Sequence, residues 1–400
     1  MSTFLELSLL IAIILMAAKL AGYFSVRLGQ PSVLGELLVG ILLGPSLLDL
    51  LHLPFLHHAE QLGETIQELG ELGVLLLMFI AGLELHLDEL SSNTKVSALA
   101  GIMGVLVPVG LGSVVARAFG LDWNAAIFMG LTLGATSVSI SAQTLMELKQ
   151  IRTRVGLGLL GAAVFDDIMI ILLLSIFLAI FAGGTTILGI LLIFGKMVFF
   201  LVTAVAFGIY LLPKIVRFNE RLPISQRTLA LGIVVLLFYG IAAEVVGGMA
   251  AITGTFLAGL MFARTPTKEK LMQGISALAY GLFVPIFFVS IGLAVNIRDM
   301  SASAVWLTLA VIAVAVVSKL LGSGIGARWA GFSWRESWQL GAGMISRGEV
   351  GLIVANVGIS AGLVTGDEFS AIVGMVLATT IVTPPFLRAL FTEKESTPAS

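Results

Sequence analysis

The sequence predicts an all-α polytopic membrane protein with about 13 transmembrane helices. Of its 400 residues, 58% are hydrophobic and only 12% are charged, whereas about 25% charged residues are usual in soluble domains. Apolar segments of roughly 20 residues, the length that crosses about 30 Å of hydrocarbon as an α-helix, recur from one end of the chain to the other. Lysine and arginine gather in alternate loops between these segments, which supports the same topology.

The first apolar segment is expected to be a retained helix rather than a signal peptide. It carries Glu6 instead of a cationic region near its start, and it is longer than the apolar region of a signal peptide. The segments that we expect to cross the membrane are residues 4–28, 33–51, 65–86, 95–119, 123–147, 153–182, 187–213, 226–243, 245–262, 271–296, 303–329, 335–362 and 368–390.

The positive charges test this count, because an odd number of segments places the two termini on opposite sides of the membrane. Sixteen of the 22 Lys and Arg residues lie after odd-numbered segments or in the C-terminal tail, two (Arg117 and Arg298) lie on the other side, and four lie inside segments. Cytoplasmic loops carry an excess of Lys and Arg. We therefore expect the N-terminus outside and the C-terminus in the cytoplasm of a chain in the inner (plasma) membrane.

The composition argues against several classes of protein. A net charge of −2 without a block of Lys or Arg offers no surface to nucleic acid. The chain has no cysteine for a disulfide, a thiolate metal site or a thiol nucleophile. It also has no metal-ligand spacing, catalytic triad or Walker phosphate loop. We expect neither an enzyme nor an ATP-driven pump, and no cofactor.

Short fragments from the first half of the chain recur in the second half at an offset of about 210 to 220 residues. The sequence GELLVG at 35–40 resembles GTFLAG at 254–259, and Gly82-Leu83 matches Gly292-Leu293. The matching segments are an odd number of crossings apart, so they enter the membrane in opposite directions. This predicts an inverted repeat, which is common in secondary transporters, although short Gly-Leu matches also arise by chance.

Two adjacent carboxylates, Asp166 and Asp167, lie near the middle of the sixth apolar segment. Each costs about 2.5–3.5 kcal/mol at the centre of a transmembrane helix, so the pair needs a partner or a purpose. Neighbouring residues on a helix point about 100° apart, so one carboxylate can face an ion cavity while the other meets a cation. Carboxylate oxygen suits an alkali cation and also accepts a proton. The alternative is a purely structural buried ion pair.

Lys319 is the natural partner for one of these carboxylates. It lies well inside the eleventh segment, so helices six and eleven are expected to approach each other. A buried lysine can gain or lose a proton during a cycle. The alternative is that its side chain extends to the cytoplasmic interface.

Two further segments are expected to be broken helices. Segment five combines Gly134 with the hydroxyl residues Thr136, Ser137, Ser139 and Ser141. Segment twelve has a glycine-rich stretch at 341–351 that contains Arg347 and Glu349. Unwound backbone inside a membrane is tolerated where it is buried or lines a cavity, and its helix ends present partial charges to ions. Arg347 and Glu349 are expected to neutralise those ends or to lie near the cytoplasmic entrance. Packing of small residues is the alternative for the hydroxyl cluster.

At these residues the chain resembles the second monovalent cation:proton antiporter family, and within it the bacterial sodium/proton antiporters. The resemblance extends over nearly the whole chain and rests on Asp166-Asp167, Lys319, and the stretches 134–137 and 347–349. It implies a fold in which two discontinuous helices cross. It also implies that Na⁺ and H⁺ compete for Asp167, that Asp166 pairs with Lys319, and that exchange is electrogenic with an elevator-type mechanism. We expect Thr136 and Ser137 to contribute to this cation and proton site.

The resemblance also implies a homodimer and a division of the chain into scaffold and core. The chain is expected to lack the cytoplasmic nucleotide-binding domain of many potassium-exporting relatives. The expected divisions are a dimerisation scaffold of 1–93 and 224–300, a transport core of 94–184 and 301–392, a linker helix of 185–223 and a cytoplasmic tail of 393–400.

Three alternatives to sodium/proton exchange remain open. Potassium/proton relatives typically have Gln-Asp where this chain has Asp166-Asp167, which favours Na⁺ over K⁺ without excluding K⁺ or Li⁺ as cargo. A sodium-coupled symporter of an organic solute would share the inverted repeat and the broken helices, but would need a roomier polar site. An ion channel would give flux that no proton gradient drives uphill.

Overall fold

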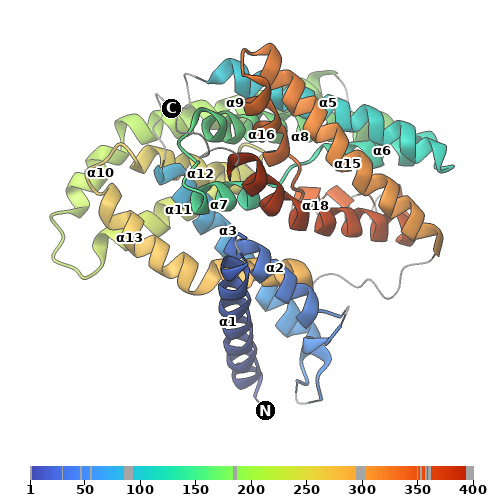
Figure 1. Cartoon of the computed structure of the whole chain (residues 1–400). Helices are drawn as coiled ribbons and strands as arrows, with labels where there is room; N and C mark the ends of the chain where they lie inside the picture. The colour runs from blue at the N-terminus through green and yellow to red at the C-terminus, as the bar shows by residue number, and fades with distance from the viewer. Residues whose placement is uncertain are drawn as a thin grey trace, which may run out of the picture. The chain divides into compact units, whose positions relative to one another are not determined.

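A computed structural model gives the arrangement of the chain (Figure 1). It describes residues 2–28, 30–45, 47–54, 56–84, 93–182, 187–293, 302–348, 350–351, 354–355, 358 and 362–392. The regular secondary structure of these residues is helical throughout. The predicted all-α class is therefore confirmed.

The described helices follow one another with short connections. Their bounds are α1 (Thr3–Arg27), α2 (Ser32–Leu43), η1 (Leu50–His52), α3 (Ala59–Glu84), α5 (Thr94–Ala118), α6 (Trp123–Gly134), α7 (Val138–Glu147), α8 (Arg154–Ala182), α9 (Ile187–Tyr210), α10 (Leu212–Asn219), α11 (Arg227–Val245), α12 (Ala251–Phe262), α13 (Lys268–Leu278), η2 (Ala279–Phe283), α14 (Val284–Leu293), α15 (Ala302–Trp329), α16 (Trp334–Gly343) and α18 (Gly366–Thr392).

Ten helical segments in the described part of the chain are long and apolar enough to cross a membrane. Two of them combine neighbouring elements, α6 with α7 and α13 through η2 to α14. The apolar helices α2 and α12 have only 12 residues each, and the expected segment 335–362 is only partly described. A multi-pass membrane protein is therefore confirmed, whereas the count of thirteen remains a prediction.

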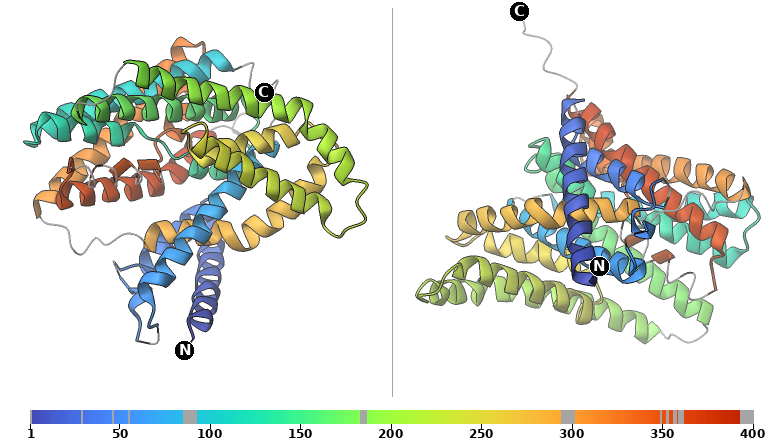
Figure 2. Two further views of the ribbon diagram at one scale, coloured as in Figure 1. Left: turned by 180° about the vertical axis from the view of Figure 1, so that it is seen from behind. Right: turned by 90° about the horizontal axis from the view of Figure 1, so that it is seen from below.

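The chain forms two compact units. The first comprises residues 1–59, 93–170 and 288–400. Within it α1 packs on α2, and α15 packs along α5 and against α16 and α18 (Figures 1 and 2). Glycine allows this close packing of backbones, as is common between membrane helices. A Cβ atom at Gly322 of α15 would lie 2.5 Å from the carbonyl oxygen of Met103 on α5.

The second compact unit comprises residues 60–92 and 171–287. Within it α11 packs on α12, α9 and α13. The helices α3 and α12 cross at two glycines, because a Cβ at Gly82 would overlap the Phe256 carbonyl and one at Gly259 would overlap the Phe79 carbonyl.

The predicted core helices between residues 94 and 170 and between 302 and 392 fall in the first unit. The helices α1 and α2, which the prediction assigns to the scaffold, belong to the same unit. A division into scaffold and core concerns which parts move together, and it remains a prediction.

Candidate functional site

The predicted break in segment five positions the first group of site residues. α6 ends at Gly134, residues 135–137 are non-helical, and α7 begins at Val138. Ala135 has φ −61° and ψ 141°, and Ser137 has φ −97° and ψ 111°. Thr136 and Ser137 are nevertheless buried. The backbone groups freed here must find partners inside the protein.

The predicted break in segment twelve has a similar form. α16 ends at Gly343, Met344 makes a turn, and residues 345–348 are non-helical. The described residues Val350 and Gly351 are helical again. Glu349, which was expected to support this break, lies outside the described residues.

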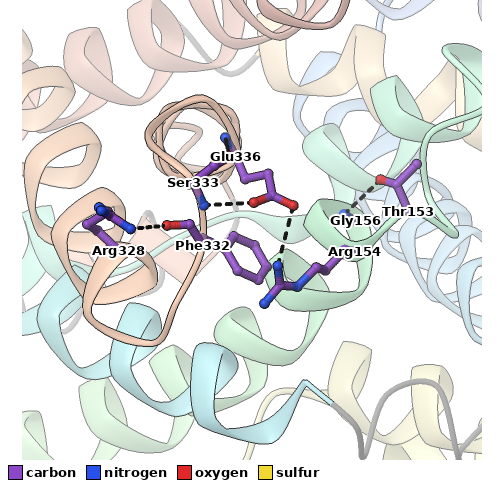
Figure 3. Close-up of polar contacts among 7 residues, drawn as sticks. All are labelled: Thr153, Arg154, Gly156, Arg328, Phe332, Ser333 and Glu336. Atoms are coloured by element: carbon purple, nitrogen blue, oxygen red, sulfur yellow. Dashed lines mark hydrogen bonds and ion pairs between the residues drawn. The ribbon is translucent and has the colours of Figure 1, made fainter.

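The start of α16 is fixed by a capping box (Figure 3). The Ser333 amide donates a hydrogen bond to Glu336 Oε2 at 2.7 Å, and the Glu336 amide donates to Ser333 Oγ at 3.2 Å. Glu336 Oε1 also lies 3.7 Å from Arg154 at the start of α8, and the Arg154 guanidinium lies 4.4 Å from the centre of the Phe332 ring. These partly exposed contacts join α16 to α8, the helix that carries Asp166 and Asp167, although an exposed ion pair contributes only about 0–1 kcal/mol.

The two breaks satisfy each other's backbone. The Ser137 amide donates to the Ser346 carbonyl at 2.9 Å, and Ser346 Oγ donates to the Ser137 carbonyl at 2.5 Å. Ser141 Oγ on α7 donates to the Gly343 carbonyl at the end of α16. The two discontinuous helices therefore meet where each is unwound.

Arg347 lies at this meeting point, and its side chain is fully buried. Its guanidinium donates to the Leu133 carbonyl at 2.9 Å and to the Ile345 carbonyl. Leu133 lies at the end of α6 and Ile345 follows the end of α16. Helix C-termini carry partial negative charge, so this one cation compensates two helix ends, the first of the two positions expected for it.

Threonines of α18 hold the backbone of the second break. Thr380 Oγ1 donates to the Arg347 carbonyl at 2.5 Å, and the Arg347 amide donates to Thr379 Oγ1 at 3.3 Å. Neither threonine was predicted from the sequence. The sequence nevertheless contains a feature that could have identified them, since Thr379-Thr380 is a hydroxyl pair within an apolar segment.

Asp166 of α8 and Lys319 of α15 form an ion pair, with Nζ 2.8 Å from Oδ1. Both residues are 0% exposed. Lys319 therefore does not extend to the membrane surface. A buried pair of this kind contributes little net stability, because desolvation offsets the attraction.

Unsatisfied oxygens surround the ion pair. Asp166 Oδ2 and Thr136 Oγ1 are buried and have no partner at full hydrogen-bond geometry among the described residues, although the two side chains are close enough to interact. Ser137 Oγ instead lies 2.9 Å from Ser139 Oγ. Buried polar groups are nearly always satisfied in folded proteins, so Asp166 and Thr136 mark a place that suits a cation, a proton or water.

Asp167 is 8% exposed, whereas its neighbour Asp166 is fully buried. Lys319 is acted on electrostatically by Asp166, Asp167 and Arg347. These four groups carry two negative and two positive charges when all are ionised. The first compact unit thus brings together five of the predicted site residues, namely Asp166, Asp167, Lys319, Thr136 and Arg347, with Ser137 at the break beside them.

Glu147 is a third residue that was not predicted from the sequence. Its carboxylate accepts hydrogen bonds from the Ser32 amide at 2.7 Å, from Ser32 Oγ at 2.6 Å and from Gln143 Nε2 at 2.8 Å. The end of α7 is thereby tied to the start of α2. No feature of the sequence around either residue indicates this pairing.

Comparisons with known proteins identify the family to which the chain belongs. Residues 12–393 match the family model described as sodium/hydrogen exchanger, transmembrane. The chain is 40% identical over 385 residues to the Na⁺/H⁺-K⁺ antiporter GerN of Bacillus cereus, with 96% of each chain covered. It is 34% identical over 386 residues to an Na⁺/H⁺ antiporter of Enterococcus hirae, covering 96% of this chain and 98% of the relative.

The fold resembles that of a solved structure of the sodium proton antiporter MjNhaP1 from Methanocaldococcus jannaschii at pH 8. The TM-score is 0.62 at 15% identity, with 98% of this chain and 96% of the other covered.

Proposed function

Because the chain belongs to the sodium/hydrogen exchanger family, we propose that it is a secondary active antiporter that exchanges Na⁺ for H⁺ at Asp167, Asp166 and Lys319. The observation that carries this proposal is the buried Asp166–Lys319 ion pair, which lies in the same unit as two helix breaks bonded to each other. Buried ionisable groups inside a membrane are expensive and mark ion pathways.

The charges of the site explain why a cation and a proton exclude each other. Two carboxylates and two cations are balanced when all are ionised. A sodium ion at Asp167 adds a positive charge in a region of low dielectric constant, where unbalanced charge is costly. Loss of a proton from the site restores the balance. Occupation by Na⁺ and by H⁺ is therefore mutually exclusive, which is the requirement for antiport.

In this proposal Asp167 binds Na⁺ or H⁺, and oxygen ligands suit both. Thr136 Oγ1 and Asp166 Oδ2 are oxygens without a hydrogen-bond partner among the described residues, so they are available to a cation or its water. Lys319 pairs with Asp166 in the cation-free state and gives up that partner during exchange. Arg347 keeps its charge and holds the helix ends in place.

In this proposal exchange proceeds by an elevator-type movement and is electrogenic. Support for a rigid-body movement comes from the hydrogen bonds between Ser137 and Ser346, because they make the two breaks a single structural block. The participation of Lys319 as well as Asp167 supports the transfer of net charge. The protein works in the plasma membrane as a homodimer, with its C-terminus in the cytoplasm.

Potassium/proton exchange is the second candidate function. It is favoured by one relative, whose name describes an Na⁺/H⁺-K⁺ antiporter. The Asp166-Asp167 pair of this chain favours Na⁺ as the principal cargo.

Reconstitution in liposomes with an acidic interior tests the proposal. A pH-sensitive dye follows proton efflux while sodium, lithium, potassium or choline salts are added outside. We expect efflux with sodium or lithium, no efflux with choline, and loss of the response in Asp167→Asn. Full exchange in a folded Asp167→Asn variant would refute the site. A response to potassium alone would move the function to potassium/proton exchange, and sodium uptake that requires an organic solute would indicate a symporter.

Electrogenicity is tested in the same liposomes by imposing a membrane potential without a pH difference. Net charge transfer predicts that the potential alone drives proton movement in the presence of sodium. It also predicts that Lys319→Ala removes this response.

A further inference from the structure

Ser323 lies on α15 one helical turn after Lys319, so the two side chains share a face of the helix. Ser323 is fully buried, and its hydroxyl oxygen makes no hydrogen bond among the described residues. A buried hydroxyl without a partner is costly.

Other buried hydroxyls in these helices avoid this cost by bonding their own backbone. The side chains of Thr132, Thr144 and Thr383 each donate to the carbonyl four residues earlier, at 3.0, 2.8 and 2.7 Å. This is the usual arrangement for Ser and Thr in a membrane helix. Ser323 forms no such bond, so its hydroxyl is directed away from its own backbone.

Gly104 of α5 shows where the Ser323 hydroxyl lies. A Cβ at Gly104 would overlap Ser323 Oγ, and it would lie 3.8 Å from Lys319 Nζ and 3.5 Å from Ser323 Cβ. The absence of a side chain at Gly104 therefore leaves room for the serine oxygen beside the lysine ammonium group. The serine oxygen and the lysine ammonium group therefore face the same point of α5, and the lysine side chain between them is flexible.

We propose that the Ser323 hydroxyl is the second partner of Lys319 and accepts a hydrogen bond from its ammonium group when Asp166 is released. The proposal rests on the proposed function, because exchange requires the Asp166–Lys319 pair to open. A buried ammonium group without a partner costs several kcal/mol, and Ser323 removes that obstacle. Ser323 is thus a positioning residue that acts through Lys319.

The charged groups that act on Lys319 come from α8 and from the stretch after α16. Asp166 and Asp167 of α8 and Arg347 after α16 act on it electrostatically. The position of α5 that faces Lys319 is occupied by the uncharged Gly104. When Asp166 takes a proton or contacts a cation, the Ser323 oxygen is a nearby acceptor that is not already bonded to the described part of the chain.

The test moves the hydroxyl from one helix to the other. Three variants are compared with the wild type in liposomes: Ser323→Ala, Ser323→Ala with Gly104→Ser, and Ser323→Ala with Gly104→Ala. The Ala substitution at 323 leaves space for either side chain at 104, because the two Cβ atoms would be 3.5 Å apart. The two double variants differ by one oxygen atom, and thermal unfolding in detergent checks that each variant is folded.

We expect Ser323→Ala to lower the maximal rate of sodium-driven proton efflux about tenfold and to displace its pH profile. The apparent KM for sodium should change less, since the carboxylates that bind the cation are intact. The variant with Gly104→Ser should recover rate and pH profile, whereas the one with Gly104→Ala should not.

Two results would overturn this role. One is an unchanged rate and pH profile in Ser323→Ala, measured where the wild type is active, which would leave the proposed function standing. The other is equal rates of the two double variants. Absence of cation-driven proton flux in the wild type would overturn the proposed function and the role of Ser323 together.

Discussion

Lys319 and Asp166 neutralise each other in a part of the protein where both side chains are 0% exposed. A buried ion pair is often no more stable than apolar residues of the same volume, but the loss of one partner leaves an uncompensated charge and costs about 3–5 kcal/mol. Stability alone therefore does not explain the pair. In the proposed exchange cycle, one charge of the pair is released only when another group replaces it.

Removal of one charge is predicted to destabilise the protein more than removal of both. Lys319→Met leaves the Asp166 carboxyl buried without its ammonium partner, so we expect a loss of about 3–5 kcal/mol. Adding Asp166→Asn removes the second charge and should restore most of the stability. Thermal unfolding in detergent measures both variants at one pH. Equal losses in the single and double variants would show that the ion pair is not coupled in this way.

The two hydrogen bonds of the Arg347 side chain require the planar shape of guanidinium. Arg347→Lys keeps the charge but cannot reach the Leu133 and Ile345 carbonyls together. We expect the exchange rate to fall about tenfold or more, while the protein still inserts and folds. Sodium-driven proton efflux measures the rate. Wild-type exchange in this variant would mean that positive charge alone is sufficient at Arg347.

The acidic pair and its lysine could be predicted because charge inside an apolar segment is conspicuous and requires a partner. The hydroxyl residues were harder to assign. The sequence identified Thr136 but not Ser323, Thr379 or Thr380, although all four are buried. A Ser or Thr side chain can bond its own helix or turn toward a neighbour, and the sequence does not determine which occurs.

At the scale of secondary structure, the two breaks depend on each other. Ser137 and Ser346 exchange hydrogen bonds, and Gly348 packs against Ser137, since a Cβ at Gly348 would lie 2.7 Å from its Oγ and 2.8 Å from its Cβ. The unwound backbone is thus satisfied and closely packed. The glycine is required by this contact between the breaks.

Gly348→Ala is predicted to force the breaks apart. We expect a loss of about 1–3 kcal/mol, as is usual when a methyl group is added to a filled site, together with slower exchange. Gly110→Ala on α5 is the matched control, because a Cβ there has nothing within 4 Å and alanine favours a helix. Unfolding temperature and efflux rate are measured for both. If the two variants behave alike, the contact at Gly348 is unimportant.

The positions of both breaks could be predicted because glycine and hydroxyl residues are concentrated in them. The lengths of α2 and α12 could not. Each has only 12 helical residues, although the apolar segments around them are longer. Hydrophobicity reports that a segment lies in the membrane, but not where its backbone leaves the helix, so the count and ends of such segments are poorly determined by sequence.

At the scale of the whole molecule, the absence of cysteine from the sequence makes the predicted orientation simple to test. Each introduced cysteine is labelled without background from native thiols. Exposed positions are available in loops expected on opposite sides: His52, whose side chain is 67% exposed, and Ser225, which is also exposed.

His52→Cys is predicted to react with a membrane-impermeant maleimide from outside intact cells. Ser225→Cys should react only after the membrane is opened or in inverted vesicles, because it lies in a loop that the positive charges assign to the cytoplasm. The extent of labelling is read by mass shift, and each variant serves as the control for the other. Labelling of both variants, or of Ser225→Cys alone, in intact cells would contradict the predicted orientation.

The hydrogen bonds between the breaks also limit how the sequence can diverge. Ser137 and Ser346 are 209 positions apart in the chain, yet each provides a partner for the other's backbone. A substitution that removes the Ser346 hydroxyl also removes a hydrogen bond to the Ser137 carbonyl, so the two stretches are energetically coupled. A chimaera that takes only one of them from a relative would combine two surfaces that were never matched. A chimaera made with a relative should therefore exchange both stretches together.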